Sequence, residues 1–325
     1  MDGIGKADIH IHTYYSGYSN LGLLKFPESV TTPEKQVDCA RKHGMDVICI
    51  TDHNAVRGGF AAQRYAKRFD DIEVVVGDEI MTADGELIGY DLNEYIEPFL
   101  SVEETADLIK EQGGLTVAPH PFSFHVNGLG EKLFDIDLDA MEVINGGHPD
   151  RYSNPFAQKV VERFPDRWAA VSSSDSHSNY TMGYNWTEFE GSTADELRRA
   201  ILARTTVPRG VPAPVLGNVQ WSYEVALGGQ KLMYRSLKKR LVPTDGNALI
   251  DKVLSLNDLK KATAIFAGIL YCMPPVSFLA TTLSTSFLGI KAKKMNARAE
   301  ERLEGIAALL EALDLQTRDG DGDDR

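Results

Sequence analysis

Apolar and polar residues alternate in the first segment of the chain. Over residues 7–12, alanine and isoleucine alternate with Asp8, His10 and His12, and a period of two predicts a β-strand with its polar side chains on one face. Adjacent imidazoles make a poor core because buried ring nitrogens need partners, whereas neutral imidazole is a common ligand for zinc, iron and manganese. Taken alone, the His-x-His pattern leaves two interpretations open, a metal-binding strand or an exposed edge strand.

Short apolar runs alternate with segments of helical spacing as far as about residue 210. Strands are expected over 46–50, 73–76, 86–90, 115–118, 140–144 and 168–171, and helices over 33–43, 59–69, 102–112, 155–163 and 193–202. Two helix starts carry clear signals, a proline at the first turn in Thr32-Pro33 and a capping box in Ser101–Glu104. Strand and helix in alternation favour a parallel sheet or barrel.

Side chains that bind metals recur at or near the ends of these strands, where α/β barrels build their active sites. The set is His10, His12, Asp52, His53, Glu79, Glu86, His120, Glu142, Asp175 and His177. Mixed imidazole and carboxylate donors suit zinc, manganese or iron. Because there are more donors than one ion can use, we expect two or three ions that share a bridging carboxylate.

Composition narrows the class of protein. The 325 residues carry a net charge of −13 and are 43% hydrophobic, which predicts one large globular domain with an appendage and argues against a broad nucleic-acid-binding surface. Cys39, Cys49 and Cys272 form no Cys-x-x-Cys pair, so we expect core cysteines and a reducing compartment. The chain does not start with a basic segment before an apolar run, so we predict no secretory signal and a cytoplasmic location.

Five ordered motifs resemble those of the PHP family, named for polymerase and histidinol phosphatase domains. They are His10-x-His12, Thr51-Asp52-His53, Gly77-x-Glu79, Pro119-His120-Pro121 and Ser174-Asp175-Ser176-His177, within roughly residues 6–210. The resemblance implies a distorted seven-stranded (β/α) barrel over residues 1–212, with a cluster of two or three divalent ions (Mn, Zn or Fe). It also implies hydrolysis of phosphate esters, with a branch similar to enzymes that act on nucleotides or short oligonucleotides.

The resemblance assigns four ligands to the first ion: His10, His12, Glu79 and Asp175. Glu79 would bridge to a second ion, completed by His120 and one more group. Glu86 stands where many relatives have a histidine, and a carboxylate there would make the site more anionic. We therefore count Glu86 among the candidate metal ligands.

His53 and His177 resemble ligands of a third ion. Relatives often add an Asp or His from the loop after the first strand, but residues 13–18 contain neither, so the third ion is left open. Without it, His53 and His177 are expected to bind phosphate or act as acid catalysts beside Asp175. In the expected mechanism, the metals lower the pKa of a bridging water, hydroxide attacks phosphorus in line, and His53 or His177 protonates the leaving alcohol.

Other polar residues have less certain roles. Three lie at strand ends: Asp8, Asp52 and Glu142. The two aspartates are expected to orient ligand imidazoles rather than bind metal, and Glu142 is either such a group or an ordinary polar residue. Arg57 and His125, in rim loops, either hold the substrate phosphate or are solvated, and His148 is expected on a surface loop.

The chain changes character beyond residue 212. We expect a basic linker or amphipathic segment over 213–261, an uncharged segment over 262–290, an amphipathic helix over 291–313, and a disordered acidic tail over 314–325. The uncharged segment reaches the roughly 20 residues that a spanning helix needs, but Pro274-Pro275 would kink or break it. A kinked spanning helix, a re-entrant hairpin on the cytoplasmic face and a soluble hairpin for homo-oligomer formation all stay open.

The sequence thus predicts a metal-dependent phosphoesterase that acts on phosphate monoesters or diesters of nucleotides or oligonucleotide ends. Two alternatives stay open: a histidinol-phosphate phosphatase, and a metal-binding regulatory domain without turnover.

Overall fold

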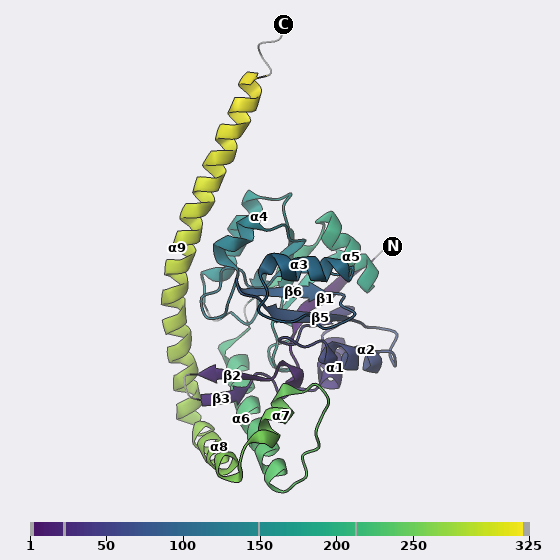
Figure 1. Ribbon diagram of the computed structural model, residues 1–325, viewed down its shortest axis with the longest axis vertical. Coiled ribbons are helices and arrows are strands. Elements are labelled where there is room, and N and C mark those ends of the chain that lie inside the picture. The colour runs from purple at the N-terminus through teal and green to yellow at the C-terminus, as the bar shows by residue number, and fades with distance from the viewer. Residues whose placement is uncertain (1–2, 22–23, 149, 212, 321–325) are drawn as a thin grey trace.

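The computed structural model describes residues 3–21, 24–148, 150–211 and 213–320. Its main feature is a strongly curved sheet with helices packed around it (Figure 1). Seven strands form the curved part of the sheet, in the order β1 (Ile4–Ile11), β4 (Val47–Ile50), β5 (Glu73–Met81), β6 (Glu86–Tyr90), β7 (Leu115–Ala118), β8 (Ala140–Asn145) and β9 (Ala169–Ser173).

The seven strands close into a distorted barrel. A parallel bridge between Ile11 and Ser176 joins the end of β1 to the segment after β9, and the His12 backbone N–H donates to the Ser176 carbonyl at 3.0 Å. Pairing is parallel throughout except around β6, which runs antiparallel to both β5 and β7. The predicted seven-stranded barrel is therefore confirmed, and the reversed strand is its distortion.

Four further strands lie outside the closed barrel. β10 (Asn185–Glu190) pairs antiparallel with β1, and β11 (Val207–Gly210) pairs with β10. A separate hairpin, β2 (Tyr18–Leu21) and β3 (Leu24–Pro27), occupies part of the polar loop that follows β1. The short or polar character of these segments hid them in the hydrophobic pattern.

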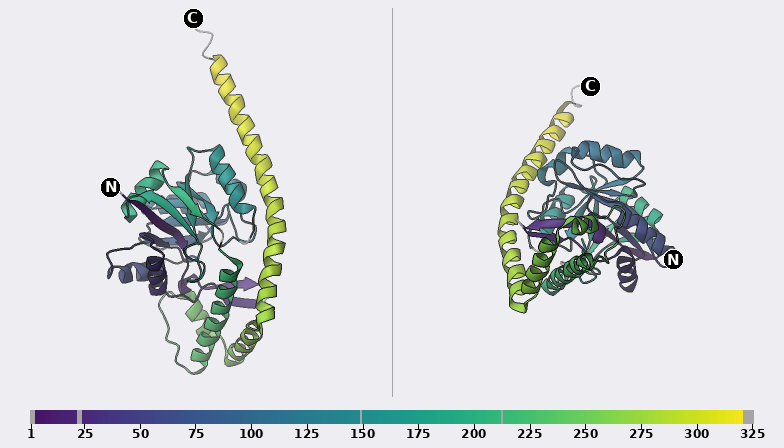
Figure 2. Two further views of the ribbon diagram at one scale, coloured as in Figure 1. Left: turned by 180° about the vertical axis from the view of Figure 1, so that it is seen from behind. Right: turned by 60° about the horizontal axis from the view of Figure 1, so that its bottom comes forward.

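Helices pack around the barrel and cover its outer surface (Figures 1 and 2). They are α1 (Pro33–Lys42), α2 (Arg57–Ala66), α3 (Val102–Glu111), α4 (Ser153–Arg163) and α5 (Ala194–Ala203), with 3₁₀ turns η1 (Tyr14–Ser16) and η2 (Gly130–Asp135). The Ser101 hydroxyl caps α3 by accepting from the Glu104 N–H at 3.2 Å. The core residues between helices and strands include Cys39 and Cys49, which are buried as the sequence predicted, whereas the same prediction was wrong for Cys272, which is only partly buried after α8.

The described segment after residue 212 is mostly helical and packs against the barrel and its loops. It contains α6 (Val215–Leu237), α7 (Ala248–Ser255), α8 (Asp258–Tyr271) and α9 (Pro274–Gly320). The long α9 lies along one side and projects past the barrel (Figure 2). Its middle is held there by ion pairs from Glu300 to Lys159 and from Arg302 to Glu131 and Asp135.

Pro274-Pro275 separates α8 from α9, because proline suits the first turn of a helix and not its interior. α9 continues to Gly320, although we expected helix only as far as Leu313, since no glycine or proline interrupts residues 306–319. The predicted tail residues 321–325 lie outside the described residues. Within the described part of the chain, no helix is both long and apolar enough to cross a membrane.

Candidate metal centre

Eight predicted ligands, from six parts of the barrel, gather in one cluster at its mouth. They are His10, His12, His53, Glu79, Glu86, His120, Asp175 and His177. The first two come from the end of β1 and its following residue, and the others from the segments after β4, β7 and β9, from β5 and from the start of β6. Alternation in β1 places both histidines on the same face, which explains why the His-x-His spacing converges.

The first donor group consists of His10, His12, Glu79 and Asp175. The two histidine Nε2 atoms lie 2.9 Å apart, and Glu79 Oε2 lies 3.3 Å from each of them. Asp175 Oδ1 lies 3.6 Å from His10 Nε2 and 3.3 Å from His12 Nε2. These are the four residues that the family resemblance assigns to the first ion.

Glu79 also reaches a second donor group. Its Oε1 lies 2.9 Å from His120 Nε2, and its Oε2 lies 2.9 Å from His53 Nδ1. Glu86 Oε2 lies 3.8 Å from His120 Nε2, and it is buried without a hydrogen-bond partner among the described residues. Glu79 therefore stands between the two groups, as a bridging carboxylate must.

The donor spacings fit coordination by divalent ions. With metal–ligand bonds of about 2.1 Å, adjacent donors lie about 3.0 Å apart in octahedral and about 3.4 Å apart in tetrahedral geometry. Donor pairs in both groups fall at or near these values, from 2.9 to 3.8 Å. His120 and Asp175 also hold left-handed backbone conformations, with φ of 28° and 49°, a strain that proteins retain mainly at functional sites.

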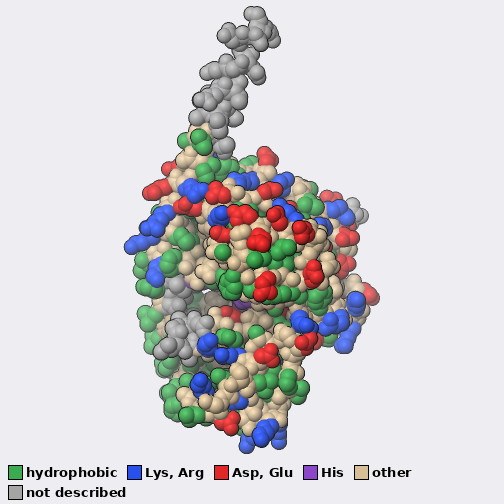
Figure 3. Space-filling model, in the orientation of Figure 1, with side chains coloured by type: hydrophobic (Ala, Val, Ile, Leu, Met, Phe, Trp, Pro, Cys, Tyr) green, Lys and Arg blue, Asp and Glu red, His purple; other side chains and the backbone are tan. Residues whose placement is uncertain are grey.

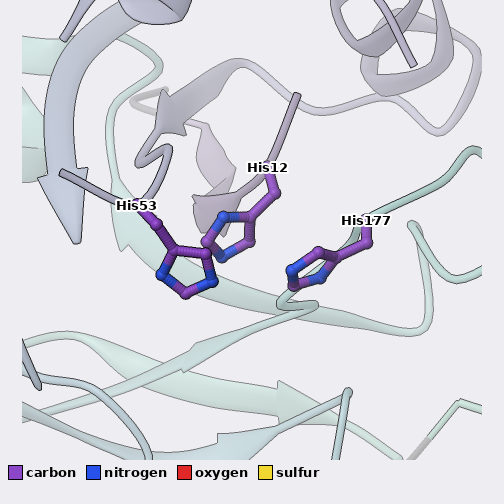
Figure 4. A group of neighbouring side chains, drawn as sticks. All are labelled: His12, His53 and His177. Carbon is purple, nitrogen blue, oxygen red and sulfur yellow. The ribbon is translucent and has the colours of Figure 1, made fainter. Parts of the chain in front are cut away.

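A third group consists of His12, His53 and His177, whose rings face one another (Figure 4). His12 Nδ1 lies 3.0 Å from the Ser16 hydroxyl, so only its Nε2 faces the cluster, and that atom belongs to the first group. Glu28, which follows β3, brings a carboxylate to 3.8 Å from His177 Nε2. A third ion would have to compete with the first for His12.

Buried acidic residues hold the ligand rings in place. Glu142 Oε1 lies 2.9 Å from His10 Nδ1, and Glu142 Oε2 accepts the His120 backbone N–H at 2.8 Å. Asp52 accepts the Ser16 hydroxyl at 2.7 Å, and Ser16 in turn contacts His12. Asp8 accepts the backbone N–H of Ser174 at 2.9 Å. Each carboxylate fixes a ligand or the segment that carries one, and Glu142 belongs with this group.

The carboxylates and imidazoles of the metal-free cluster shift one another's pKa values. Burial alone would lower the pKa of His53, but the facing Glu79 carboxylate outweighs burial and raises the pKa to about 10. The same opposition, with a hydrogen bond to Glu79, raises the pKa of His120 to about 9. Burial and the neighbouring His12 lower the pKa of His177 to about 3. The Glu79 carboxylate thus favours the protonated form of both His53 and His120 when no metal ion is bound.

The site opens toward a hollow between the barrel and the part of the molecule built from β2, β3, α6 and α7, where histidine is visible (Figure 3). At this opening, the side chains of His53 and His177 are 24% and 18% exposed. Trp221 of α6 stands 6.0 Å from the His177 ring, centre to centre, and its indole N–H donates to the Glu28 carbonyl at 3.1 Å. α6 thereby adds an aromatic wall to the site.

Arg57 and His125, for which phosphate binding and a solvated position were both left open, do not join the cluster. Arg57 forms an ion pair with Asp245 and is about half exposed. His125 is separated from the cluster by His148, and the His125 and His148 rings are 4.9 Å apart, centre to centre. Burial, with the nearby His120, lowers the pKa of His125 to about 4. An uncharged imidazole at neutral pH offers no positive charge to a phosphate.

Three residues at the site were not recognised in the sequence. The prediction that His148 lies on the surface was wrong, because the loop after β8 folds inward and stacks His148 on His120 at 5.5 Å between ring centres. Glu28 and Trp221 lie far from the motifs along the sequence. The β2–β3 hairpin brings Glu28 to the site, and α6 brings Trp221 there. The histidine count near the motifs was the one signal that could have drawn attention to His148.

Comparisons with known proteins agree with this architecture. A model of the family described as PHP-associated matches residues 152–206. The chain is 50% identical to the uncharacterized protein MJ1587 of Methanocaldococcus jannaschii over 163 residues, which cover 50% of this chain and 95% of that protein. MJ1588 of the same organism is 33% identical over 113 residues, 35% of this chain and 95% of the relative.

Among solved structures, PsfC from Pseudomonas syringae PB-5123 has a similar fold. It aligns with a TM-score of 0.52 at 18% sequence identity, covering 68% of this chain and 98% of PsfC. The identity over nearly the whole of MJ1587 shows that this chain and MJ1587 belong to one family, and the PHP-associated match spans the segment that carries the Ser174–His177 motif of the barrel mouth.

Proposed function

We propose that this protein is a metal-dependent hydrolase that cleaves phosphate esters of nucleotides or the ends of short oligonucleotides. The observation that carries the proposal is the position of Glu79, whose Oε1 lies 2.9 Å from His120 Nε2 of the second group. The same residue lies 3.3 Å from His10 and His12. One buried carboxylate between two donor groups is the arrangement of a two-metal site.

Divalent ions bound at such a centre neutralise phosphoryl oxygens and lower the pKa of a coordinated water. The ligands themselves would be His10, His12 and Asp175 on one side of Glu79, and His120 and Glu86 on the other. Imidazole and carboxylate together favour manganese, zinc or iron. The protein holds this set rigidly, because Glu142 fixes both His10 and the backbone of His120.

His53 and His177 lie at the opening and differ in protonation state. His53 Nδ1 donates toward Glu79, whose negative charge favours the protonated ring, so His53 is the residue that we assign to protonate the leaving oxygen. His177 Nδ1 donates to its neighbour's carbonyl, Asp175 O, at 3.1 Å, which leaves an Nε2 lone pair at the opening. Two titratable groups that are held apart in this way suit the donor and acceptor roles of acid–base catalysis.

Trp221 supports a substrate with a planar group. An aromatic ring fixed at the edge of the site offers a stacking surface that every nucleobase can use, worth about 1–3 kcal/mol. The net charge of −13 disfavours long nucleic acid across the surface. A nucleotide or a short end that enters the opening satisfies both observations.

A substrate panel tests the proposal. Purified protein is assayed with nucleoside mono- and bisphosphates, short RNA and histidinol phosphate, each with Mn²⁺, Zn²⁺ and Mg²⁺. We expect nucleotide hydrolysis that is lost in Glu79→Gln and retained in Glu190→Gln, an exposed carboxylate of β10. Preference for histidinol phosphate would favour the second candidate substrate, and metal binding without hydrolysis of any of them would contradict an enzymatic role.

The leaving-group dependence of His53→Gln tests the assigned proton donor. We expect kcat for an alkyl phosphate ester to fall about 10²–10⁴-fold, and kcat for p-nitrophenyl phosphate, whose leaving group needs no proton, to fall far less. His43→Gln, at the exposed end of α1, is the matched control. Equal losses for the two substrates would show that His53 has another role.

A further inference from the structure

α8 and α9 follow one another along the chain and both pack on α6, and their outer surface is apolar and exposed. Side chains on it are between 45% exposed, for Val276, and 69% exposed, for Leu283. Hydrophobic side chains appear along the corresponding edge of the molecule in Figure 3. We call this surface the α8–α9 apolar face, and its described large side chains are Phe266, Ile269, Leu270, Met273, Val276, Leu279, Leu283, Phe287 and Ile290. Apolar groups so concentrated on a surface mark an interaction site.

The α9 part of this face points away from the barrel. Ala299 and Leu303 are buried against the core, and Ala292 is also buried. At about 100° per residue, Leu283 lies about 180° around the helix from Ala292. Val276, Leu279, Leu283, Phe287 and Ile290 follow one another by three or four positions and form a stripe opposite Ala292, while Phe278, also exposed (55%), lies on another side of the helix. Packing among the described residues therefore leaves this stripe uncovered.

The charges around the face indicate what covers it. No charged residue lies between 262 and 290, and the flanks carry Lys260, Lys291, Lys293 and Lys294, all exposed. The nearest acidic residues along the chain are Asp258 and Glu300. A second copy would bring the same lysines with no acidic residue inside the face to pair with them, and like charges across an interface are unfavourable.

An anionic lipid surface complements both features. Apolar side chains of an interfacial helix enter the boundary between headgroups and acyl chains, and flanking lysines remain among anionic headgroups. Neither α8 nor α9 qualifies as a spanning helix in the part of the chain that the structure describes, which fits binding in the plane of the interface. We propose that the α8–α9 apolar face docks the protein on anionic membranes, independently of which ester the barrel hydrolyses.

Vesicle flotation with the full-length protein tests this inference. The probes are vesicles of phosphatidylcholine alone and of phosphatidylcholine with 30% phosphatidylglycerol, where the lipid fraction is chosen as roughly that of an anionic membrane. We expect binding to the anionic vesicles at least about tenfold above binding to the neutral ones. The double variant Lys293→Gln, Lys294→Gln should weaken the binding several-fold.

Substitutions within the face separate it from the rest of α9. Leu283→Gln with Phe287→Gln should abolish flotation, whereas Leu309→Gln, which is equally exposed but lies outside the face (61%), should leave it unchanged. Hydrolysis of a soluble substrate should not change in any of these variants. Failure to bind vesicles, or binding unaffected by Leu283→Gln with Phe287→Gln, would overturn the inference. A dimer in solution that only those substitutions dissociate would overturn it in favour of a second copy.

Discussion

The replacement Glu142→Gln probes how the barrel holds its metal ligands. The Glu142 carboxylate accepts from His10 Nδ1 at 2.9 Å and from the His120 backbone N–H at 2.8 Å, and Asn145 and Ser173 also donate to it. An amide offers one oxygen and one NH₂ group in the same volume. The amide oxygen can accept from either His10 Nδ1 or the His120 backbone N–H. The NH₂ group then faces the other donor, and that hydrogen bond is lost.

The magnitude follows from the contacts that are lost. A buried donor without a partner costs about 1–3 kcal/mol, and loss of a carboxylate that orients a ligand histidine typically weakens metal binding about 10–100-fold. Tenfold corresponds to about 1.4 kcal/mol, so the two figures agree. We expect Glu142→Gln to bind Mn²⁺ or Zn²⁺ about 10–100-fold more weakly, although Glu142 itself is not among the proposed ligands.

Competition with a chelator of known affinity measures this change directly. Glu190→Gln, which removes an exposed carboxylate at the end of β10, controls for the loss of one negative charge. If Glu142→Gln bound metal within twofold of the native protein, the hydrogen bonds to His10 and His120 would not be what organises the site. Complete loss of both ions would instead indicate that Glu142 is itself a ligand.

Metal binding should release a proton, because the pKa of His120, a proposed ligand, is raised to about 9 in the metal-free protein. The His120 ring holds a proton at pH 7, so metal affinity should rise with pH up to that range, and calorimetry in buffers of different ionisation enthalpy should detect the release; no release at pH 7 would contradict it. Gly58→Ala should lower both Tm and metal affinity, because a Cβ there would lie 1.8 Å from Asp52 Oδ2. Gly305→Ala, with no atom within 4 Å of the added Cβ, should be neutral or slightly stabilising, and equal effects of the two substitutions would contradict the steric argument.

Local patterns along the chain predicted the barrel and most of its mouth. Alternation around His10 and His12 indicates β1, and a polar residue after an apolar run indicates a strand end, which in a barrel is also the position of the site. Such reasoning placed His53, Glu79 and His120 together because parallel strands end at one rim. It failed where pairing is not local: β10 is a polar segment that pairs with β1 from the other end of the domain, and β11 pairs in turn with β10.

The C-terminal part needed the three-dimensional structure. Nothing in the spacing of residues 213–261 shows that α6 packs beside the mouth and brings Trp221 to His177. Similarly, Glu28 reaches the opening because the β2–β3 hairpin folds back. The absence of charged residues over 262–290 indicated an apolar surface. Only the packing of α9 shows which side of that helix faces outward.

The central claim is that Glu79 bridges two metal ions at the mouth of the barrel. Anomalous diffraction from crystals grown with Mn²⁺ locates the ions without reference to activity. The account predicts two peaks, each about 2.2 Å from a carboxylate oxygen of Glu79, one bounded by His10, His12 and Asp175 and the other by His120. Ordered side chains at these positions with no peak between them, or peaks that do not touch Glu79, would contradict it.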